Sequence, residues 1–509
     1  MEDLLNVSRA VTEGYKVWIA LGGVLIALLW VRSNRRTLVQ LLLGLTIVAG
    51  LNYARWGERA LFVQVDSYDL IHYYLNAKYF DELGYYDLYP ACMLADHENA
   101  GPYFDEGNKY MAQDEAGHSM QPIAHALSRG KVVRDTNFTE ERWEEFEHDL
   151  IFFQRKTRDL NAKLWRQMIQ DHGFNGTPTW VLFAEPIATV IPVEYVKMLG
   201  YIDLLLLAGA VVAVGWAYGG TTAMWTALFL LVSYSMRWPT VTWVFLRYDF
   251  LFGMILAMCL LKKRKPLWAG IFAGYTGVLR MFPVMWMWGP FAKGVSGLTR
   301  KMVHKRLLVF AGGFLIAVVA IEGVALVRYG VEPTVVHFEN MMDHNKPEQL
   351  SSRRVGLALA LPFRGATLPK FIEKERKAKV EKQKPLRYGL AFLYLLIVGW
   401  GMRHLRDDEA YGFGFIPFFL LTTASYYYYI TRVTLAILHA SDLSKLRNRV
   451  GLAMILGLEA FTNGAESMLP GHRVFLVGYL SWGLALYAIV MGTWFIVESL
   501  QKKADDTTE

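Results

Sequence analysis

The sequence contains little cysteine and little charge for its length. Only Cys92 and Cys259 occur among 509 residues, too few for a disulfide framework or a cysteine zinc site. Charged residues make up 19% of the chain, hydrophobic residues make up 54%, and the mean hydropathy is +0.23. This composition excludes a disordered chain, a coiled coil and a disulfide-rich scaffold, and it argues against three or so soluble domains.

Other sequence signals are missing as well. No internal repeat of about 20–50 residues is visible. The chain opens Met1-Glu2-Asp3, without the basic segment and small-residue cleavage site of a signal peptide, so we expect none. Asp66 and Asp69 alone are too few ligands to predict a metal site, and nothing in the sequence indicates a cofactor.

The net charge of +7 is unevenly distributed along the chain. Residues 55–171 contain 21 acidic and 13 basic side chains, which leaves an excess of basic residues in the rest of the chain. A basic protein with an acidic insert is not typical of nucleic-acid binding. It is typical of a membrane protein that has basic cytoplasmic loops and one acidic outer domain.

Apolar runs predict an all-α polytopic membrane protein with about 11–14 transmembrane helices. A membrane span needs about 20 mainly apolar residues. The candidate runs are 17–31, 37–53, 196–218, 221–236, 243–261, 267–279, 281–292, 307–328, 387–402, 411–428, 430–441, 450–469 and 473–499. The runs on either side of Arg280 and Pro283 are interpreted as one broken or re-entrant hairpin.

Basic clusters predict which way the spans run. Alternating the spans places all five clusters and the C-terminus on one side, which is the cytoplasm by the positive-inside rule. The clusters are Arg32–Arg36, Lys262–Lys265, Lys293–Arg306, Arg403–Arg406 and Lys445–Arg449. We therefore expect an integral plasma-membrane protein whose N-terminus lies outside.

This scheme divides the chain into five parts. Residues 1–54 are expected to form two N-terminal spans, and residues 55–177 a large extracytoplasmic loop domain. A transmembrane core follows at 178–328, a second extracytoplasmic loop at 329–386, and a C-terminal bundle at 387–509. In the first loop, Thr139–Lys163 is predicted to be a helix with Trp143, Phe146, Leu150 and Phe153 on one face.

The second outer loop contains a conflict. Lys370–Arg387 carries eight basic and three acidic residues, which breaks the positive-inside rule. Either 355–369 is a fourteenth span, which would reverse the later topology, or the basic segment is an outer surface helix. We favour the surface helix, because Pro362, Arg364 and Pro369 make a poor span.

The richest segment for chemistry directly follows the second span. If it is helical, Asp69, Tyr73, Ala77 and Phe80 lie on one side, and His72 runs alongside. A carboxylate would then stand at the top of an aromatic stripe where the chain leaves the bilayer. The alternative is a solvated first turn, because acidic residues favour helix N-termini.

This segment resembles the first outer loop of GT-C superfamily glycosyltransferases, most closely glycosyltransferase family 87. The family pattern is an aspartate, an aromatic residue at plus four, a small residue at plus eight and then Gly-x-x-Leu-Tyr. Here these are Asp69, Tyr73 and Ala77 and, less tightly, Gly84 through Leu88-Tyr89. Further similar stretches are Thr177–Trp180 with Glu185-Pro186, Ala269-Gly270 with Arg280–Pro283, and His344 with Arg353–Leu357. Where the family often has an asparagine before Gly-Leu, this chain has Arg353-Arg354.

The resemblance implies a GT-C-like fold and an enzyme that moves a hexose or pentose. The donor would be a polyprenyl-phosphate sugar, and the acceptor an extracytoplasmic glycolipid or glycan attacked with inversion. Asp69 would be the general base that takes the proton of the acceptor hydroxyl. Asp66, one turn earlier, is the rival for that role, and His344 would lie near the donor phosphate.

A leaving lipid phosphate needs positive charge and hydrogen-bond donors around it. The basic candidates are Arg237, Arg247, Arg280, Arg353 and Arg354, and the nearby substrate-binding candidates are His72, Tyr73 and Lys78. Alternatives stay open, since Arg280 could cap a cytoplasm-facing turn and Arg247 could pair with Asp249. Tyr426–Tyr429 fits either an interfacial aromatic belt or a surface that packs against sugar or isoprenoid.

Two other classes of function compete with the transferase. A transporter or flippase for lipid-linked sugars would also have many spans and intramembrane charge, but it would have paired interrupted helices. The sequence shows one interrupted pair, near Arg280, and no counterpart in the second half. The third class is a silent scaffold that uses its acidic loop as a partner site. In every case membrane lipids are expected partners and nucleic acid is not.

Overall fold

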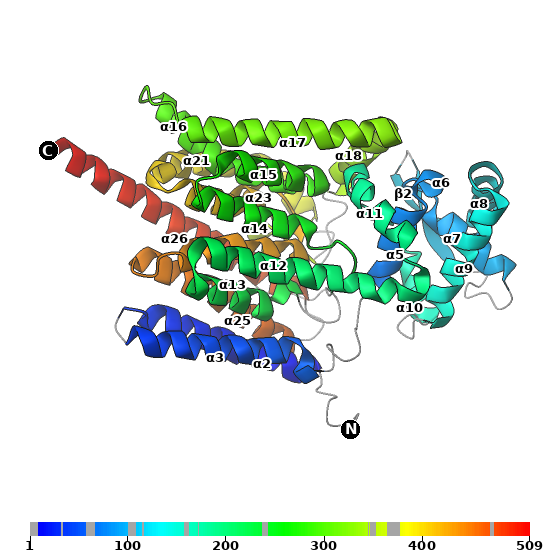
Figure 1. Cartoon of the computed structure of the whole chain (residues 1–509), viewed down its shortest axis with the longest axis horizontal. Helices are drawn as coiled ribbons and strands as arrows, with labels where there is room; N and C mark the ends of the chain where they lie inside the picture. The colour runs from blue at the N-terminus through cyan, green and yellow to red at the C-terminus, as the bar shows by residue number, and fades with distance from the viewer. Residues whose placement is uncertain are drawn as a thin grey trace.

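The computed structural model shows a bundle of long helices with a smaller, mainly helical domain at one end (Figure 1). The residues that it describes are 9–31, 34–57, 67–99, 108–114, 117–156, 162–171, 173–236, 243–344, 346, 353–363, 377–468 and 473–508. The sequence prediction of a helical membrane protein is confirmed at this level.

Six helical segments in the described residues are long and apolar enough to cross a membrane. They are α2 (Arg9–Leu29), α3 (Arg35–Tyr53), η2 with α12 (Val193–Leu199 and Gly200–Tyr218), α17 (Lys305–Tyr329), α21 (Lys384–Gly401) with η6 (Met402–His404), and α26 (Arg473–Thr508). All six coincide with predicted apolar runs. A total of 11–14 spans stays a prediction.

The other apolar runs form helices that are shorter, broken or more polar. They are α13 (Gly220–Val232), α14 (Asp249–Lys262), α15 (Pro266–Arg280), η4 (Phe282–Met287), α16 (Trp288–Leu298), α22 (Asp407–Gly412), α23 (Phe415–Leu421), η7 (Tyr426–Arg432), α24 (Val433–Ala440) and α25 (Leu446–Met468). Small residues let some of them pack backbone to backbone. A Cβ atom on Gly270 of α15 would lie 2.0 Å from the carbonyl oxygen of Phe310 in α17.

The helix break at Arg280 is present as predicted. Helix α15 ends at Arg280, Met281 has a φ of 55°, and η4 leads into α16. The prediction that the second half has no counterpart is wrong. Residues 407–440 form four short helices, and they pack directly on η4, where Trp286 Nε1 donates to Thr434 Oγ1 at 3.1 Å.

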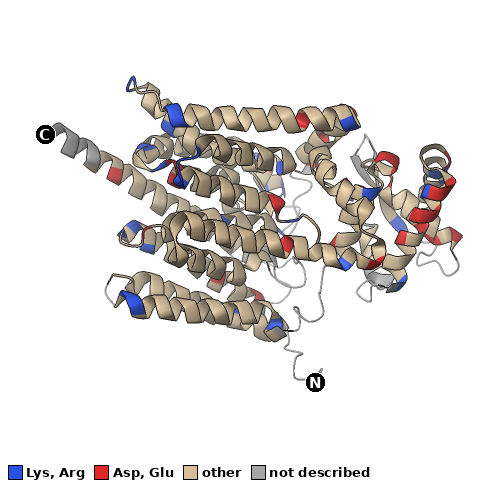
Figure 2. Cartoon of the chain, viewed as in Figure 1, with Lys and Arg blue, Asp and Glu red and all other residues tan. Residues whose placement is uncertain are grey.

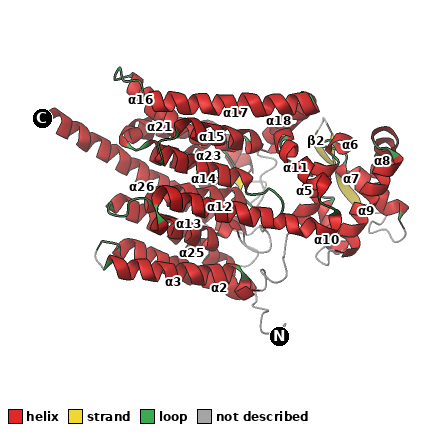
Figure 3. Cartoon of the chain, in the orientation of Figure 1, coloured by secondary structure: helices red, strands yellow, loops and turns green. Residues whose placement is uncertain are grey.

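Most of the predicted first outer loop gathers at one end of the bundle, and we call this group of elements the outer domain after its expected location. Its elements are α5 (Ser67–Lys78), α6 (Phe80–Leu83), α7 (Leu88–Glu98), β1 (Lys109–Asp114), β2 (Gly117–Pro122), α8 (Ile123–Asn137), α9 (Glu140–Lys156) and α10 (Ala162–Met168). Strands β1 and β2 form an antiparallel hairpin, so the all-α prediction needs this small correction (Figure 3).

Helix α9 confirms the predicted periodicity. It begins at Glu140, and the hydroxyl of Thr139 accepts a hydrogen bond from the Arg142 backbone at 3.3 Å, as an N-cap does. The predicted apolar face is buried, and it consists of Trp143, Phe146, Leu150 and Phe153. Because this face fills the centre of the domain, α9 holds α5 and α7 in place.

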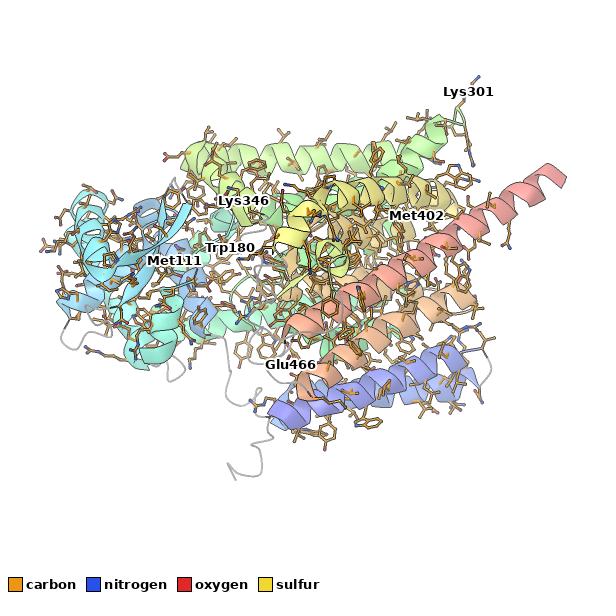
Figure 4. The ribbon with its side chains drawn as sticks, turned by 180° about the vertical axis from the view of Figure 1, so that it is seen from behind. Met111, Trp180, Lys301, Lys346, Met402 and Glu466 are labelled. Carbon is orange, nitrogen blue, oxygen red and sulfur yellow. The ribbon has the colours of Figure 1, made fainter. Side chains whose placement is uncertain are left out.

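The outer domain sits on the bundle through α5, α11 (Pro178–Val190) and α18 (Glu332–His344). Arg328 at the end of α17 pairs with Asp81 at 2.7 Å and with Glu185 at 2.8 Å, and so it ties both parts together. Trp180 lies at this junction, whereas Met402 and Lys301 lie toward the other end of the bundle (Figure 4).

The basic clusters come together at the end of the bundle opposite the outer domain (Figure 2). Lys262 Nζ lies 5.2 Å from the centre of the Tyr218 ring, and Arg406 donates to the hydroxyl of Ser441 at 3.3 Å. At the same end Lys293 pairs with Asp407 at 2.6 Å. Which side of the membrane this end faces, and the full alternation of spans, stay predictions.

The conflict around 355–387 is settled in part. Residues 353–363 form the two-residue strand β3 (Arg354–Val355) and the four-residue α19 (Leu357–Ala360), so the described portion of 355–369 is not a span. Residues 364–376 lie outside the described residues, and with them the first seven residues of the predicted surface helix, whereas residues 377–382 are helical. The end of the basic segment, from Lys384, starts α21 instead of lying along a surface.

We predict that the outer domain and α18 face one compartment and the basic clusters the other. Cysteine introduced at exposed Glu140 and Glu332 should react with an impermeant thiol reagent from the same side of sealed vesicles, and cysteine at Lys301 only from the opposite side. Background should be low, because Cys92 and Cys259 are both buried. Labelling of positions 140 and 301 from the same side would contradict this topology.

Candidate functional site

Asp69 lies in the first turn of α5, at the boundary between the outer domain and the bundle. Its carboxylate forms an ion pair with the guanidinium of Arg247, which comes from the segment just before α14. The Asp69 side chain is 28% exposed and that of Arg247 is 13% exposed. The open alternative of an Arg247–Asp249 pair is not what the structure shows.

Tyr73, one turn after Asp69, is surrounded by charge and aromatic rings. Its ring meets the Trp180 ring edge to face at 5.2 Å between centroids. The guanidinium carbons of Arg247 and Arg280 lie 5.8 and 5.9 Å from the centre of the same ring. Because the face of an aromatic ring carries negative charge, Tyr73 holds the two cations near each other.

The aromatic stripe itself ends earlier than predicted. Helix α5 stops at Lys78, Tyr79 is the N-cap of α6, and Phe80 begins that next helix. Ala77 and Phe80 are buried in the core of the domain. The part of the stripe that faces the site is therefore Asp69 and Tyr73 alone.

Asp203, which the sequence analysis did not single out, positions Arg247. Its buried carboxylate accepts backbone hydrogen bonds from Val244 at 2.8 Å, Arg247 at 2.8 Å and Tyr248 at 3.1 Å. Leu246 in the same turn has a φ of 49°, and its carbonyl oxygen accepts from Trp180 Nε1 at 3.1 Å. These bonds hold a strained turn that directs Arg247 toward Asp69.

Arg280 ends α15 beside Asp249, and the two are close enough to interact electrostatically. Three polar atoms here are buried without a hydrogen-bond partner among the described residues, namely Arg280 Nε, Asp249 Oδ2 and the Tyr248 hydroxyl. Unsatisfied polar groups are costly when buried, and they concentrate at functional sites. The alternative that Arg280 caps a turn at the basic end does not fit this location.

Tyr427 and Tyr428 complete a small cavity. The cavity has a volume of about 20 Å³, and its lining includes Tyr73, Arg247, Tyr248, Phe250, Arg280, Tyr427, Tyr428 and Ile430. That volume holds about one water molecule. A substrate therefore needs this cluster of side chains to open.

A buried ion pair fixes the turn that carries the two tyrosines. Arg432 and Glu459 are fully buried and pair at 2.8 Å. Arg432 also donates to the Tyr429 carbonyl oxygen at 2.9 Å and to the Ser235 hydroxyl at 3.3 Å. Since Tyr426 and Tyr429 are buried and held from within the bundle, the four tyrosines are not simply an interfacial belt.

Arg354 lies on strand β3, which pairs with β4 (Ala424–Ser425) just before the tyrosine turn, and Arg353 directly precedes this strand. Arg354 donates to the Thr423 carbonyl oxygen at 3.1 Å. Burial raises the pKa of the Tyr68 hydroxyl above its usual value, and the positive charge of nearby Arg353 acts in the opposite direction. The structure thus brings Arg353 toward the helix that carries Asp69, whereas Arg354 is bound at the start of the tyrosine turn.

Two predicted residues lie away from the cavity. His72 is buried, with Nδ1 2.9 Å from the Tyr68 carbonyl oxygen and Nε2 2.8 Å from the Tyr89 hydroxyl. Lys78 is buried and pairs with Asp149 at 2.7 Å. Both are satisfied inside the outer domain, so a structural role is the simpler account of each.

Three further candidates cannot be placed in the site. Asp66 and Arg237 lie outside the described residues. His344 is the last residue of α18, and the described part of the chain does not include its side chain. The choice between Asp66 and Asp69 as the base therefore stays a prediction, although Asp69 is the one with a described arginine partner.

His337, two turns before His344 on α18, is a residue that the sequence analysis missed. It is buried, it interacts with the Gly176 backbone, and its ring lies 6.1 Å from that of Tyr85. Burial and then the charge of Arg280 lower the pKa of His337 to about 4. The sequence did hold a signal for His337. It lies seven residues before His344, a spacing that places two residues on the same face of a helix.

We predict that His337 makes the protein sensitive to acid. Its pKa is near 4 in the fold and about 6.5 in an unfolded chain, so the unfolded state gains a proton first as the pH falls. The free energy of unfolding should drop by about 3 kcal/mol between pH 6.5 and pH 4 from this group. Thermal unfolding of His337→Gln should show a smaller decline over that range than wild type, and an equal decline would contradict the assignment.

Within the described residues, no group of three or more His, Cys, Asp or Glu side chains is arranged to hold a metal ion. Comparison with known proteins adds nothing to the geometry. No family model, no curated protein sequence and no solved structure matches this chain.

Proposed function

We propose that this protein is a membrane glycosyltransferase that moves a sugar from a polyprenyl-phosphate donor to an extracytoplasmic glycolipid or glycan. One observation carries the proposal. Asp69, Tyr73, Arg247 and Arg280, from three segments far apart in the sequence, converge where the outer domain meets the bundle. The resemblance to family 87 supplies the substrate class, and this convergence supports it.

In the proposed reaction, Asp69 takes the proton from the acceptor hydroxyl as its oxygen bonds to the anomeric carbon. The bond between that carbon and the donor phosphate oxygen breaks, and its electron pair stays on the leaving lipid phosphate. Positive charge forms transiently on the sugar ring, and the carboxylate of Asp69 also stabilises it.

Arg247 has two roles in this scheme. In the structure its guanidinium lines the cavity and is bound to Asp69, so the carboxylate is occupied. A phosphate offers the same bidentate acceptor geometry as a carboxylate. We propose that the donor phosphate takes Arg247 from Asp69, so the base is released only when the donor is bound.

Arg280 serves the leaving group. It is a buried cation with an unpaired Nε, beside an aspartate with an unpaired oxygen. Negative charge that develops on the phosphate would find a preorganised donor here, in a site that water barely enters. The turn that carries Tyr427 and Tyr428 lines the cavity as well. The ring centroids of Tyr428 and Phe282 lie 5.1 Å apart at the helix break.

A transporter or flippase for lipid-linked sugars is the second candidate. It is favoured by the broken segment 407–440, which packs against the broken helix at Arg280. Paired interruptions of this kind are common at transport sites. Labelled polyprenyl-phosphate sugar and a lipid extract separate the two candidates, because the transferase yields a lipid product of increased mass and the transporter only moves the label across the membrane.

Asp69→Asn is expected to keep the fold and donor binding while it lowers transfer about 10²–10⁴-fold, because asparagine cannot accept the proton. The measurement is product formation by purified protein in liposomes. Asp135→Asn, an exposed acid in the same domain, is the matched control and should retain full activity. A general base usually contributes at least about a hundredfold to the rate. If Asp69→Asn keeps more than about a tenth of wild-type transfer, Asp69 is therefore not the base, and Asp66 is tested next.

Arg280→Ala is expected to slow departure of the phosphate. Its defect should therefore shrink when the donor carries a better leaving group, whereas the defect of Asp69→Asn should stay the same. The ratio of rates with the two donors is the readout, and His344→Ala should behave like Arg280→Ala. If the better leaving group restores the transfer rate of Asp69→Asn and Arg280→Ala equally, the assignment of Asp69 to the nucleophile and Arg280 to the leaving group is contradicted.

A further inference from the structure

A second cavity lies at the opposite end of the bundle, where none of the residues of the candidate site is found. Its volume is about 350 Å³, within the usual range for small-molecule pockets. Residues from three interhelical turns line it. They are Trp30, Val31 and Arg35 from the first turn, 218–222 from the second, and 440–444 from the third.

The lining is rich in hydrogen-bonding groups. Thr221, Ser441, Ser444 and Arg35 all line the cavity. The Ser441 hydroxyl donates to the Leu438 carbonyl oxygen and that of Ser444 donates to Asp442, so the anion-binding group among the four is Arg35. Arg35 is exposed, and it makes no ion pair with any residue that the structure describes. Such a guanidinium at the edge of a polar cavity is suited to a small oxyanion.

The balance of charge around the cavity is positive. Its one acidic side chain, Asp442, pairs with Lys445 at 3.3 Å and accepts from the Ser444 backbone at 3.2 Å. Lys262 lies over the Tyr218 ring at 5.2 Å, and Arg406 donates to the Ser441 hydroxyl. Lys262 is within electrostatic reach of Asp408, Glu409 and Asp442, so Arg35 is the cation of the lining that remains to attract an anion.

The turn between α12 and α13 leaves its backbone open to the cavity. Gly219 has a φ of 94°, which disfavours any side chain there, and no side chain caps the N-terminus of α13. A Cβ atom on Gly220 would meet nothing within 4 Å. The first amides of α13 are thus accessible to an anion that Arg35 has bound.

We propose that this cavity binds a phosphate group, presented by the headgroup of an anionic phospholipid. The cavity lies at the end of the bundle where the basic clusters gather, and such clusters are the residues that attract anionic lipid headgroups. A small soluble phosphate compound offers the same chemistry, so the experiment separates the two sources. This site does not depend on the proposed transferase function.

The test is native mass spectrometry of the full chain in detergent, with dioctanoyl phosphatidylglycerol, dioctanoyl phosphatidylcholine or inorganic phosphate added separately. Wild type should retain one phosphatidylglycerol in preference to phosphatidylcholine. Arg35→Gln should weaken that binding about tenfold, the effect of removing one charge-assisted hydrogen bond from a phosphate site. Gly220→Leu should abolish it by filling the cavity, since the glycine position is sterically open.

Matched controls exclude loss of fold or of general charge. Arg36→Gln removes the neighbouring exposed cation, which does not line the cavity, and Gly457→Leu adds the same side chain at another open glycine. Both should bind like wild type. If inorganic phosphate binds in wild type but not in Arg35→Gln, and the lipids are not distinguished, the phosphate site stands with a soluble ligand. If neither phosphatidylglycerol nor phosphate binding changes in Arg35→Gln and Gly220→Leu, the proposal is overturned.

Discussion

The cost of placing charge in hydrocarbon is the constraint on which the rest of this structure depends. Charged side chains collect at the two ends of the bundle, acidic in the outer domain and basic at the far end (Figure 2). Within the bundle an ion pair holds two of the charges that remain. Arg432 and Glu459 are fully buried, and each satisfies backbone or hydroxyl groups as well as the other. Removal of one partner would leave an uncompensated charge, which typically costs about 3–5 kcal/mol.

The same constraint explains why the candidate site lies where it does. A cation such as Arg280 is tolerable only near the end of an apolar helix, where aromatic faces and nearby carboxylates replace water. The helix breaks at Met281, and there Tyr73 of the outer domain lies against Arg280 while Asp69 pairs with Arg247. The junction thereby gains a half-buried, charged cavity whose chemistry neither part has by itself. The cavity of about 350 Å³ at the other end is built differently, because turns line it instead of broken helices.

Residue types near the site could be predicted, but their directions could not. His72 and Lys78 belong to the same helix as Asp69, yet they turn into the domain and are satisfied by Tyr89 and Asp149. Conversely, Asp203 and His337 have no motif around them, and they act through backbone groups of distant turns. Helical periodicity fixes which residues share a face. It does not say which face the neighbouring segments will cover.

The sequence by itself determined the class of the protein. Long apolar runs must satisfy their backbone as helices, and the basic clusters must share one end, so both features follow from composition and spacing. The amphipathic face of α9 was equally readable. Only the tertiary structure decided that Arg247 pairs with Asp69 and that Arg280 faces Tyr73. It also decided that residues 407–440 form short helices that pack on η4. These contacts join segments more than a hundred residues apart, and their energies depend on packing and desolvation that no local pattern encodes.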